Sequence, residues 1–172
     1  MIVFKNVRQV IAAATVCALP QVQAQTLSVD VELPRLSVAE YHKPYVAVWV
    51  AKENNQIAAH LAVLYDVEMS GGKGEKWLKD MRQWWRRGGR NLDFPMDGVT
   101  GATKGPGTHN LTFASQLSDL AAGNYRLMVE AAREVGGREL IEIPFTWPAK
   151  NAVSERVSGS EELGSVALSI EP

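Results

Sequence analysis

The chain has 172 residues, of which 46% are hydrophobic and 22% are charged, and its formal net charge is −1. This composition is typical of a globular protein, and the lack of a basic excess argues against a nucleic-acid-binding protein. A single cysteine excludes an intramolecular disulfide and any metal site built from several thiolates.

The first 24 residues have the features of a secretory signal peptide. Lys5 and Arg8 supply the positive start, and residues 10–19 form an apolar run that is too short to span a bilayer. Val22-Gln23-Ala24 offers a small residue for cleavage, so we expect cleavage after Ala24 and export to the periplasm. Removal of this peptide also removes the cysteine and leaves 16 basic and 19 acidic side chains, a formal charge of −3. No later segment is long and apolar enough to predict a membrane span.

Most of residues 25–172 alternate apolar and polar side chains with the period of a β-strand. Gly136-Gly137 and the polar run 53–56 are hairpin signals between such segments. The segments predicted as strands are 27–33, 45–50, 57–65, 111–113, 125–131, 140–147 and 166–170. About seven short strands predict a mainly β fold, and we expect an immunoglobulin-like β-sandwich that forms a single domain over residues 25–172.

One segment, residues 75–87, follows helical spacing instead, and Gly88-Gly89 ends it. Its apolar side is formed by Trp77, Leu78, Met81, Trp84 and Trp85. We expect Trp77 and Trp84 to face the core. Residues 88–107 show neither the strand period nor the helix period, so we predict a long loop that is inserted together with the helix. Residues 148–164 are polar, and we predict a linker there.

Within the predicted loop lies the stretch Asp97-Gly98-Val99-Thr100-Gly101-Ala102-Thr103. Gly101 and Ala102 remove side-chain bulk beside the Thr103 hydroxyl, and glycine permits positive φ. An unobstructed hydroxyl suits phosphoryl transfer, which depends mainly on positioning and charge stabilisation. Asp97 is expected to orient the loop or to coordinate the metal ion of a modifying enzyme. The alternative is an ordinary turn, because Gly, Thr and Asp are common turn residues.

This stretch resembles the acceptor motif of bacterial extracytoplasmic proteins that carry covalent FMN. In that motif an Asp is followed three residues later by Ser or Thr, then by Gly, Ala and a final Ser or Thr. The resemblance implies that a FAD:protein FMN transferase attaches FMN through its phosphate to Thr103. Asp97, Thr100, Gly101 and Ala102 would complete the cofactor site. The protein would then be an electron carrier rather than an enzyme by itself.

Five further stretches, spread over nearly the whole mature chain, resemble a protein family. They are LPR (33–35), YVAVWV (45–50), GEKWLKD (74–80), WWRR (84–87) and EAARE (130–134). Together they resemble the domain-of-unknown-function 2271 family of predicted periplasmic proteins. This resemblance implies a periplasmic location. Through the gene neighbourhoods of the family, it also implies a PepSY-domain membrane protein as the electron-transfer partner.

Two interpretations stay open for Trp85 and Arg87. An isoalloxazine ring stacks well on indole and a guanidinium pairs with phosphate, so both residues are candidate flavin contacts. Equally, Trp85 fits the apolar stripe of the helix and Arg87 fits its solvated face.

His42, His60 and His109 lack ligand-type spacing, so no metal site is predicted. If the seven-residue stretch is only a turn, the protein is instead a non-redox immunoglobulin-like binding or assembly module of a periplasmic or membrane complex.

Overall fold

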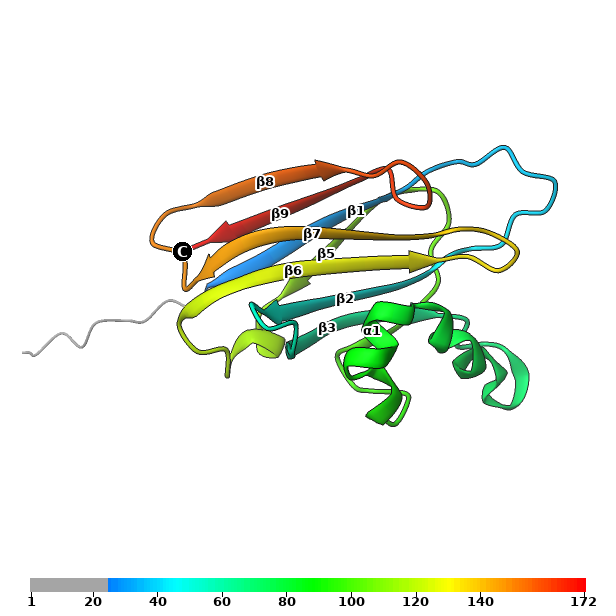
Figure 1. The fold of residues 1–172 in the computed structure, drawn as a ribbon, viewed down its shortest axis with the longest axis horizontal. Coiled ribbons are helices and arrows are strands. Elements are labelled where there is room, and N and C mark those ends of the chain that lie inside the picture. Colours follow the sequence, from blue (N-terminus) through cyan, green and yellow to red (C-terminus); the bar gives the residue numbers. More distant parts are fainter. Residues whose placement is uncertain (1–24) are drawn as a thin grey trace, which may run out of the picture.

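The computed structural model describes residues 25–172, and the predicted signal peptide, residues 1–24, lies outside the described residues. Within the described part, nine strands form two sheets that pack face to face (Figure 1). They are β1 (Thr26–Leu33), β2 (Tyr45–Lys52), β3 (Ile57–Tyr65), β4 (Thr100–Ala102), β5 (Gly107–Phe113), β6 (Gly123–Ala132), β7 (Arg138–Trp147), β8 (Val153–Ser158) and β9 (Ser165–Glu171). The strand orders are β5-β1-β9-β8 and β4-β3-β2-β6-β7. The prediction of a mainly β sandwich is confirmed.

Helical segments occupy the connection between β3 and β4. They are the 3-10 helix η1 (Ser70–Asp80), the short α1 (Arg82–Arg87) and the 3-10 turn η2 (Gly89–Asn91). A further 3-10 turn, η3 (Ser115–Leu117), follows β5. Because β3 and β4 run parallel, the chain must cross over between them, and the helical segments make that crossover. No helix within residues 25–172 is long and apolar enough to cross a membrane.

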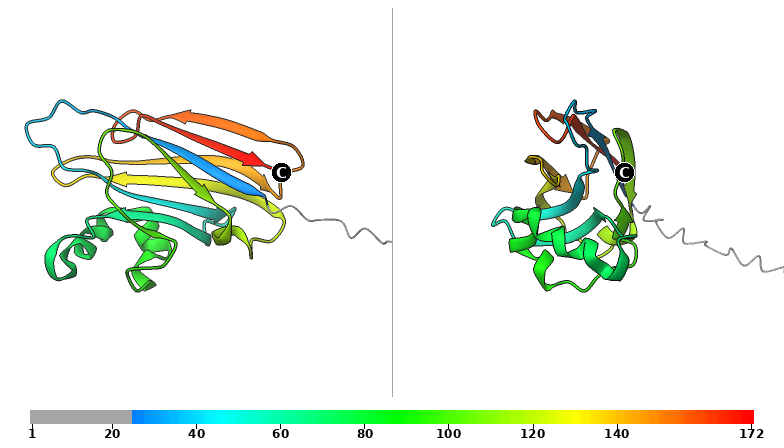
Figure 2. Two further views of the ribbon diagram at one scale, coloured as in Figure 1. Left: turned by 180° about the vertical axis from the view of Figure 1, so that it is seen from behind. Right: turned by 90° about the vertical axis from the view of Figure 1, so that its right-hand side faces the viewer.

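Hydrophobic cores lie on both faces of the five-stranded sheet. Val46, Val48 and Val50 of β2 belong to the core between the sheets. Ala47 and Trp49 point the other way, into a second core under the helical segments. The helical segments therefore form a third layer, visible beneath β2 and β3 (Figures 1 and 2). This arrangement explains why residues 45–50 are apolar on both faces.

The tryptophans of the helical layer differ from prediction in one case. Trp84 is fully buried, as expected, but Trp77 is 36% exposed, so its predicted core position is wrong. Residues 70–80 form 3-10 turns rather than an α-helix, with a kink at Gly71 and Gly72, both at a φ of 68°, and the chain breaks again at Met81 before α1 begins. With three residues per turn, a 3-10 helix buries Leu78 and leaves Trp77 at the surface.

Two edge strands occur where the sequence predicted a loop and a linker. β4 has the sequence Thr-Gly-Ala and lies inside the predicted loop, residues 88–107. β8 lies inside the predicted linker, residues 148–164, and nearly all of its side chains are exposed. Edge strands such as these are held by backbone pairing with one neighbour rather than by an apolar face, so the sequence pattern does not reveal them.

A buried carboxylate attaches the helical layer to the sheet. Glu130 of β6 is 0% exposed. Its two oxygens accept the backbone N–H groups of Gln83 (3.1 Å) and Trp84 (2.8 Å), and Arg138 Nη1 donates to it at 2.9 Å. Gln83 and Trp84 lie in the first turn of α1, where N–H groups have no partner within the helix. Glu130 thus fixes where the helix begins.

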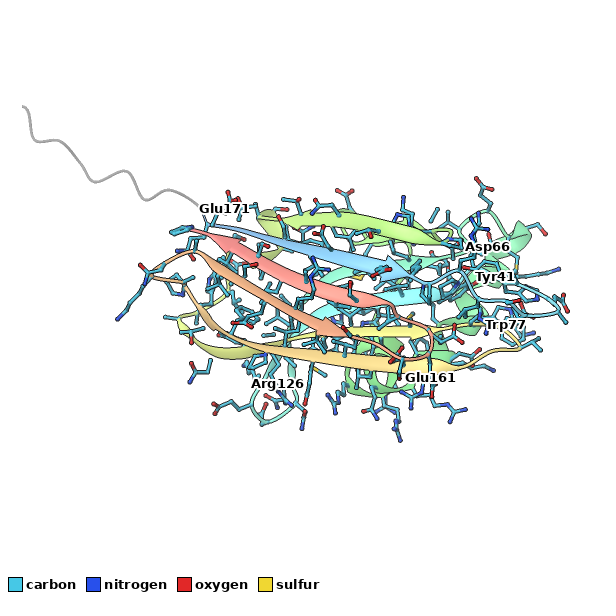
Figure 3. All side chains as sticks on the ribbon, turned by 90° about the horizontal axis from the view of Figure 1, so that it is seen from above. Tyr41, Asp66, Trp77, Arg126, Glu161 and Glu171 are labelled. Carbon is cyan, nitrogen blue, oxygen red and sulfur yellow. The ribbon has the colours of Figure 1, made fainter. Side chains whose placement is uncertain are left out.

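The molecule is elongated, and its two ends differ. Tyr41, Asp66 and Trp77 lie at one end, whereas Glu171, beside the C-terminus, lies at the other (Figure 3). The connection between β1 and β2 and the turn between β6 and β7 are also at the end that carries Tyr41 (Figure 1). This end is formed by connections rather than by chain termini.

We predict that Glu130→Ala lowers the free energy of unfolding by about 3 kcal/mol, because it leaves buried helix N–H groups and Arg138 without their acceptor. Denaturant unfolding followed by circular dichroism measures the change. The matched control is Glu142→Ala, which removes an exposed partner of Arg126 (2.9 Å) and should cost less than about 1 kcal/mol. Equal losses in the two variants would contradict the anchoring role.

A pH dependence follows from His60, whose Nδ1 accepts the Trp84 Nε1–H at 3.1 Å. Burial lowers the pKa of His60 below its usual value of about 6.5. The unfolded chain therefore binds the proton more readily, and stability should fall as the pH drops below about 6.5 toward the lower folded-state pKa. In His60→Gln the amide oxygen can still accept the bond but does not titrate. Between about pH 7 and pH 5 the native protein should lose more unfolding free energy than this variant, and parallel curves would refute the assignment.

Candidate functional site

The second half of the seven-residue stretch is an ordered edge strand. β4 pairs in parallel with β3, and Gly101 lies opposite Leu64. On either side of β4 the chain is held as well: Val63 N–H donates to the Val99 carbonyl (2.9 Å), and Thr103 N–H donates to the Tyr65 carbonyl (3.1 Å). The prediction of a loop is therefore wrong for residues 100–102, and backbone pairing with β3 also fixes the position of Thr103.

The first half of the stretch is a closed turn. Met96 N–H donates to Thr100 Oγ1 (2.8 Å), and Thr100 N–H donates to the Met96 carbonyl (2.9 Å). The residue with positive φ in this turn is Gly98, at 69°, and not Gly101 as the sequence suggested. Asp97 is exposed at the outer side of the turn. The Thr100 hydroxyl is therefore committed to the local structure.

Gly101 is required for a different reason. A Cβ atom at this position would lie 2.8 Å from Cδ2 of Leu64, a core residue that is 6% exposed. Any larger side chain would have to push Leu64 into the core between the sheets. The glycine thus allows β4 to lie directly against β3.

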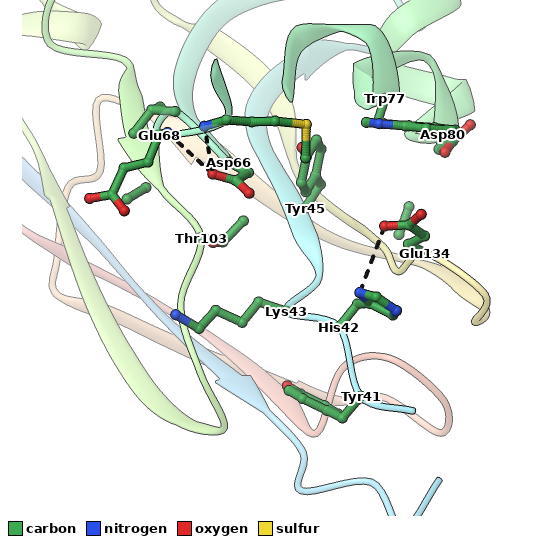
Figure 4. A pocket seen from close by; sticks show the side chains of 14 residues that line it. Tyr41, His42, Lys43, Tyr45, Asp66, Glu68, Trp77, Asp80, Thr103 and Glu134 are labelled. Carbon is green, nitrogen blue, oxygen red and sulfur yellow. Dashed lines mark hydrogen bonds and ion pairs between the residues drawn. The ribbon is translucent and has the colours of Figure 1, made fainter. Parts of the chain in front are cut away.

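Thr103 lies at the rim of a cavity of about 420 Å³, which we call the Thr103 cavity. It is formed where the ends of β3 and β4 meet η1, the connection before β2 and the turn after β6 (Figure 4). Its aromatic side chains are Tyr41, Tyr45 and Trp77, and its charged ones are Lys43, Asp66, Glu68, Asp80 and Glu134. A volume of this size is typical of small-molecule sites.

The position of η1 over the cavity is set by the end of β3. Asp66 Oδ1 accepts the backbone N–H groups of Glu68 (3.2 Å) and Met69 (3.1 Å), which turns the chain into η1. Gly74 then packs directly on the Asp66 carbonyl, where a Cβ atom would overlap the oxygen. Tyr45 Oη donates to the Gly74 carbonyl at 3.1 Å. These contacts hold η1, and with it Trp77, at the cavity.

The cavity is acidic overall, and burial raises the pKa of both of its phenols, Tyr41 and Tyr45. Burial raises the pKa of the Tyr45 phenol, and the carboxylates of Asp66 and Glu134 raise it further. His42 lies between Glu40 (Nε2 to Oε1, 3.1 Å) and Glu134 (Nδ1 to Oε2, 3.7 Å). Lys43 is exposed at the rim. In the described part of the chain, no three His, Cys, Asp or Glu side chains are grouped as metal ligands.

The residues that the sequence analysis grouped into one cofactor site do not all lie at one place in the structure. Ala102 and Thr103 line the Thr103 cavity, whereas Asp97, Thr100 and Gly101 line a neighbouring depression that Ala102 shares. Trp85 and Arg87 line neither. Trp85 is half-buried against the helical-layer core. Arg87 Nη1 is buried and has no hydrogen-bond partner within residues 25–172.

Sequence reasoning missed most of the cavity lining, including Tyr41, Lys43, Asp66 and Trp77. Asp66 directly follows β3, and Tyr41 and Lys43 directly precede β2. Polar and aromatic residues at strand ends were the available signal. That signal becomes specific only when the parallel pairing of β3 and β4 is known, because this pairing brings Asp66 and Thr103 to the same edge.

We predict that Gly101→Val lowers the unfolding free energy by about 1–3 kcal/mol, because the added side chain overpacks the core at Leu64. The matched control is Gly105→Val, since a Cβ atom at Gly105 meets no atom within 4 Å. The control should stay within about 0.5 kcal/mol of the native protein. If denaturant unfolding gives equal values for both variants, Gly101 is not a packing requirement.

Comparison with known proteins gives one result. Among curated proteins and solved structures, none matches the chain. A family model described as a predicted periplasmic protein matches residues 26–165, which span β1 to the start of β9 and include every residue of the Thr103 cavity. The chain therefore belongs to the DUF2271 family of predicted periplasmic proteins.

Proposed function

We propose that this protein is a periplasmic electron carrier with FMN bound covalently to Thr103. The observation that carries the proposal is the position of Thr103: it directly follows the edge strand β4 and stands at the rim of a cavity lined by aromatic side chains. It is also the final hydroxyl residue of the stretch that resembles the FMN acceptor motif. The family description as a predicted periplasmic protein supports the compartment.

The attachment reaction is a phosphoryl transfer from FAD. Thr103 Oγ1 bonds to the phosphorus of the FMN half, the pyrophosphate bond breaks, and AMP leaves. The hydroxyl proton passes to a base of the transferase or to solvent. The product is a phosphodiester that carries a single negative charge. Catalysis belongs to the FAD:protein FMN transferase, and this chain contributes an acceptor hydroxyl held in a fixed place.

The residues around Thr103 fit the group they would hold. The volume of about 420 Å³ falls in the range of cofactor pockets. Trp77, Tyr41 and Tyr45 offer aromatic surface, and Lys43 offers a cation for the phosphodiester. Flavin supplies the capacity to accept and release electrons, and the protein supplies position and environment.

Covalent attachment suits a carrier outside the cytoplasm, where an unbound cofactor would be lost by diffusion. The tether also keeps the flavin at a high effective concentration beside its binding surface. A PepSY-domain membrane protein is the proposed redox partner, on the basis of the family's gene neighbourhoods. The proposal for the site does not depend on the identity of this partner.

We predict that co-expression with a FAD:protein FMN transferase yields a protein whose intact mass includes one FMN phosphoester and whose gel band fluoresces. Thr103→Ala should abolish the adduct, and Thr103→Ser should restore it. The matched control is Thr108→Ala, which removes an exposed hydroxyl outside the seven-residue stretch and should leave the adduct unchanged. Circular dichroism checks that each variant folds.

Two outcomes would count against the proposal. The adduct could be absent although the same transferase modifies a known substrate, or it could persist in Thr103→Ala. The first outcome favours the alternative, a non-redox binding or assembly module of a periplasmic or membrane complex. The second shifts the attachment to another hydroxyl.

A further inference from the structure

We infer that the Thr103 cavity is the binding site for the isoalloxazine ring, with the indole of Trp77 as its stacking surface. The inference rests on the proposed attachment of FMN to Thr103 and adds where the ring lies once attached. It also assigns a role to an aromatic residue outside the seven-residue stretch. The ligand class is a flat, uncharged heteroaromatic ring on a flexible tether.

Trp77 differs from the other tryptophans in the described chain. Trp49 and Trp84 are 0% exposed and Trp147 is 8% exposed, and the half-buried Trp85 does not line the cavity. Trp77 is 36% exposed and lines the cavity. An exposed indole leaves a large apolar surface in water, and covering it with a flat ring is favourable. Lys79, which does not line the cavity, has its Nζ over the indole, 5.9 Å from the ring centroid.

Thr103 and Trp77 stand on different walls of the same cavity. Thr103 is at the edge formed by β4, whereas Trp77 belongs to η1, above His42 and Glu134 in the view (Figure 4). In the same view Tyr45 lies between the two residues, so a ribityl chain that starts from the phosphate on Thr103 must pass Tyr45 to reach the indole (Figure 4). Lys43 lies on the Thr103 side in the same view, where the phosphodiester would be (Figure 4).

The charge of the cavity explains why the ring needs a tether. The lining carries the carboxylates of Asp66, Glu68, Asp80 and Glu134 against the single lysine Lys43. Free FMN carries a phosphate with close to two negative charges and would be repelled. The phosphodiester has lost one of these charges. The covalent tether also keeps the ring at a high effective concentration beside the cavity, so the ring does not need a high binding affinity of its own. Free FMN should therefore not bind the unmodified protein.

The experiment compares flavin emission in loaded proteins after intact mass has shown equal loading. Indole stacked on isoalloxazine quenches its fluorescence, so native loaded protein should be dim and strongly polarised. Trp77→Leu should brighten the emission severalfold and lower its polarisation. The matched control is Trp85→Leu, a neighbouring tryptophan that does not line the cavity and should leave the emission unchanged. Trp77→Phe provides a second variant that keeps an aromatic ring and should give intermediate emission.

The outcomes separate the two proposals. If no adduct forms, the proposed function itself fails. If the adduct forms but native protein and Trp77→Leu have the same emission and polarisation, or if Trp85→Leu alone brightens it, the ring does not stack on Trp77 and this inference is overturned while the attachment stands. A last measurement titrates the unmodified protein with free FMN, which should not bind. Tight binding of free FMN would contradict the role of the tether.

Discussion

The structure depends on one carboxylate that has no access to water. Glu130 projects from the central sheet into the helical layer, and an unpaired charge there would be strongly destabilising. Its oxygens are instead occupied by the first N–H groups of α1 and by Arg138. These bonds are directional, so they fix the start of α1 on β6 more narrowly than apolar packing alone would. The crossover that leads from β3 to β4 is anchored at this point.

The candidate site is assembled from segments that are far apart in the sequence. The crossover brings β4 back beside β3, and the register of this pairing sets Thr103 next to the residue that follows β3. At the same edge, Asp66 and Gly74 hold η1 and thereby set the place of Trp77. Backbone hydrogen bonds and one glycine contact therefore position the two residues on which the proposed chemistry depends, and neither residue is carried by a free loop.

The sequence was sufficient to locate a strand where buried and exposed side chains alternate along it. The period-two pattern located β3 at its observed bounds, and residues 45–50 indicated a strand with apolar cover on both faces. It was insufficient for β4, because Thr-Gly-Ala has no apolar face and is ordered by pairing with a distant strand. It also misplaced Trp77, since a 3-10 helix and an α-helix distribute the same residues differently. The motif singled out Thr103 as the proposed attachment residue, but no sequence pattern indicated the cavity around it.

The distance between the C-terminus and the cavity has a practical consequence. Glu171 is at the opposite end of the molecule from Tyr41 and Trp77 (Figure 3). A protein immobilised through a tag after Pro172 would therefore point its cavity away from the support and toward the bulk solution. On a conducting surface the same orientation would hold the cavity remote from the metal, so direct voltammetry of the proposed flavin would require attachment through the connection that contains Tyr41 instead.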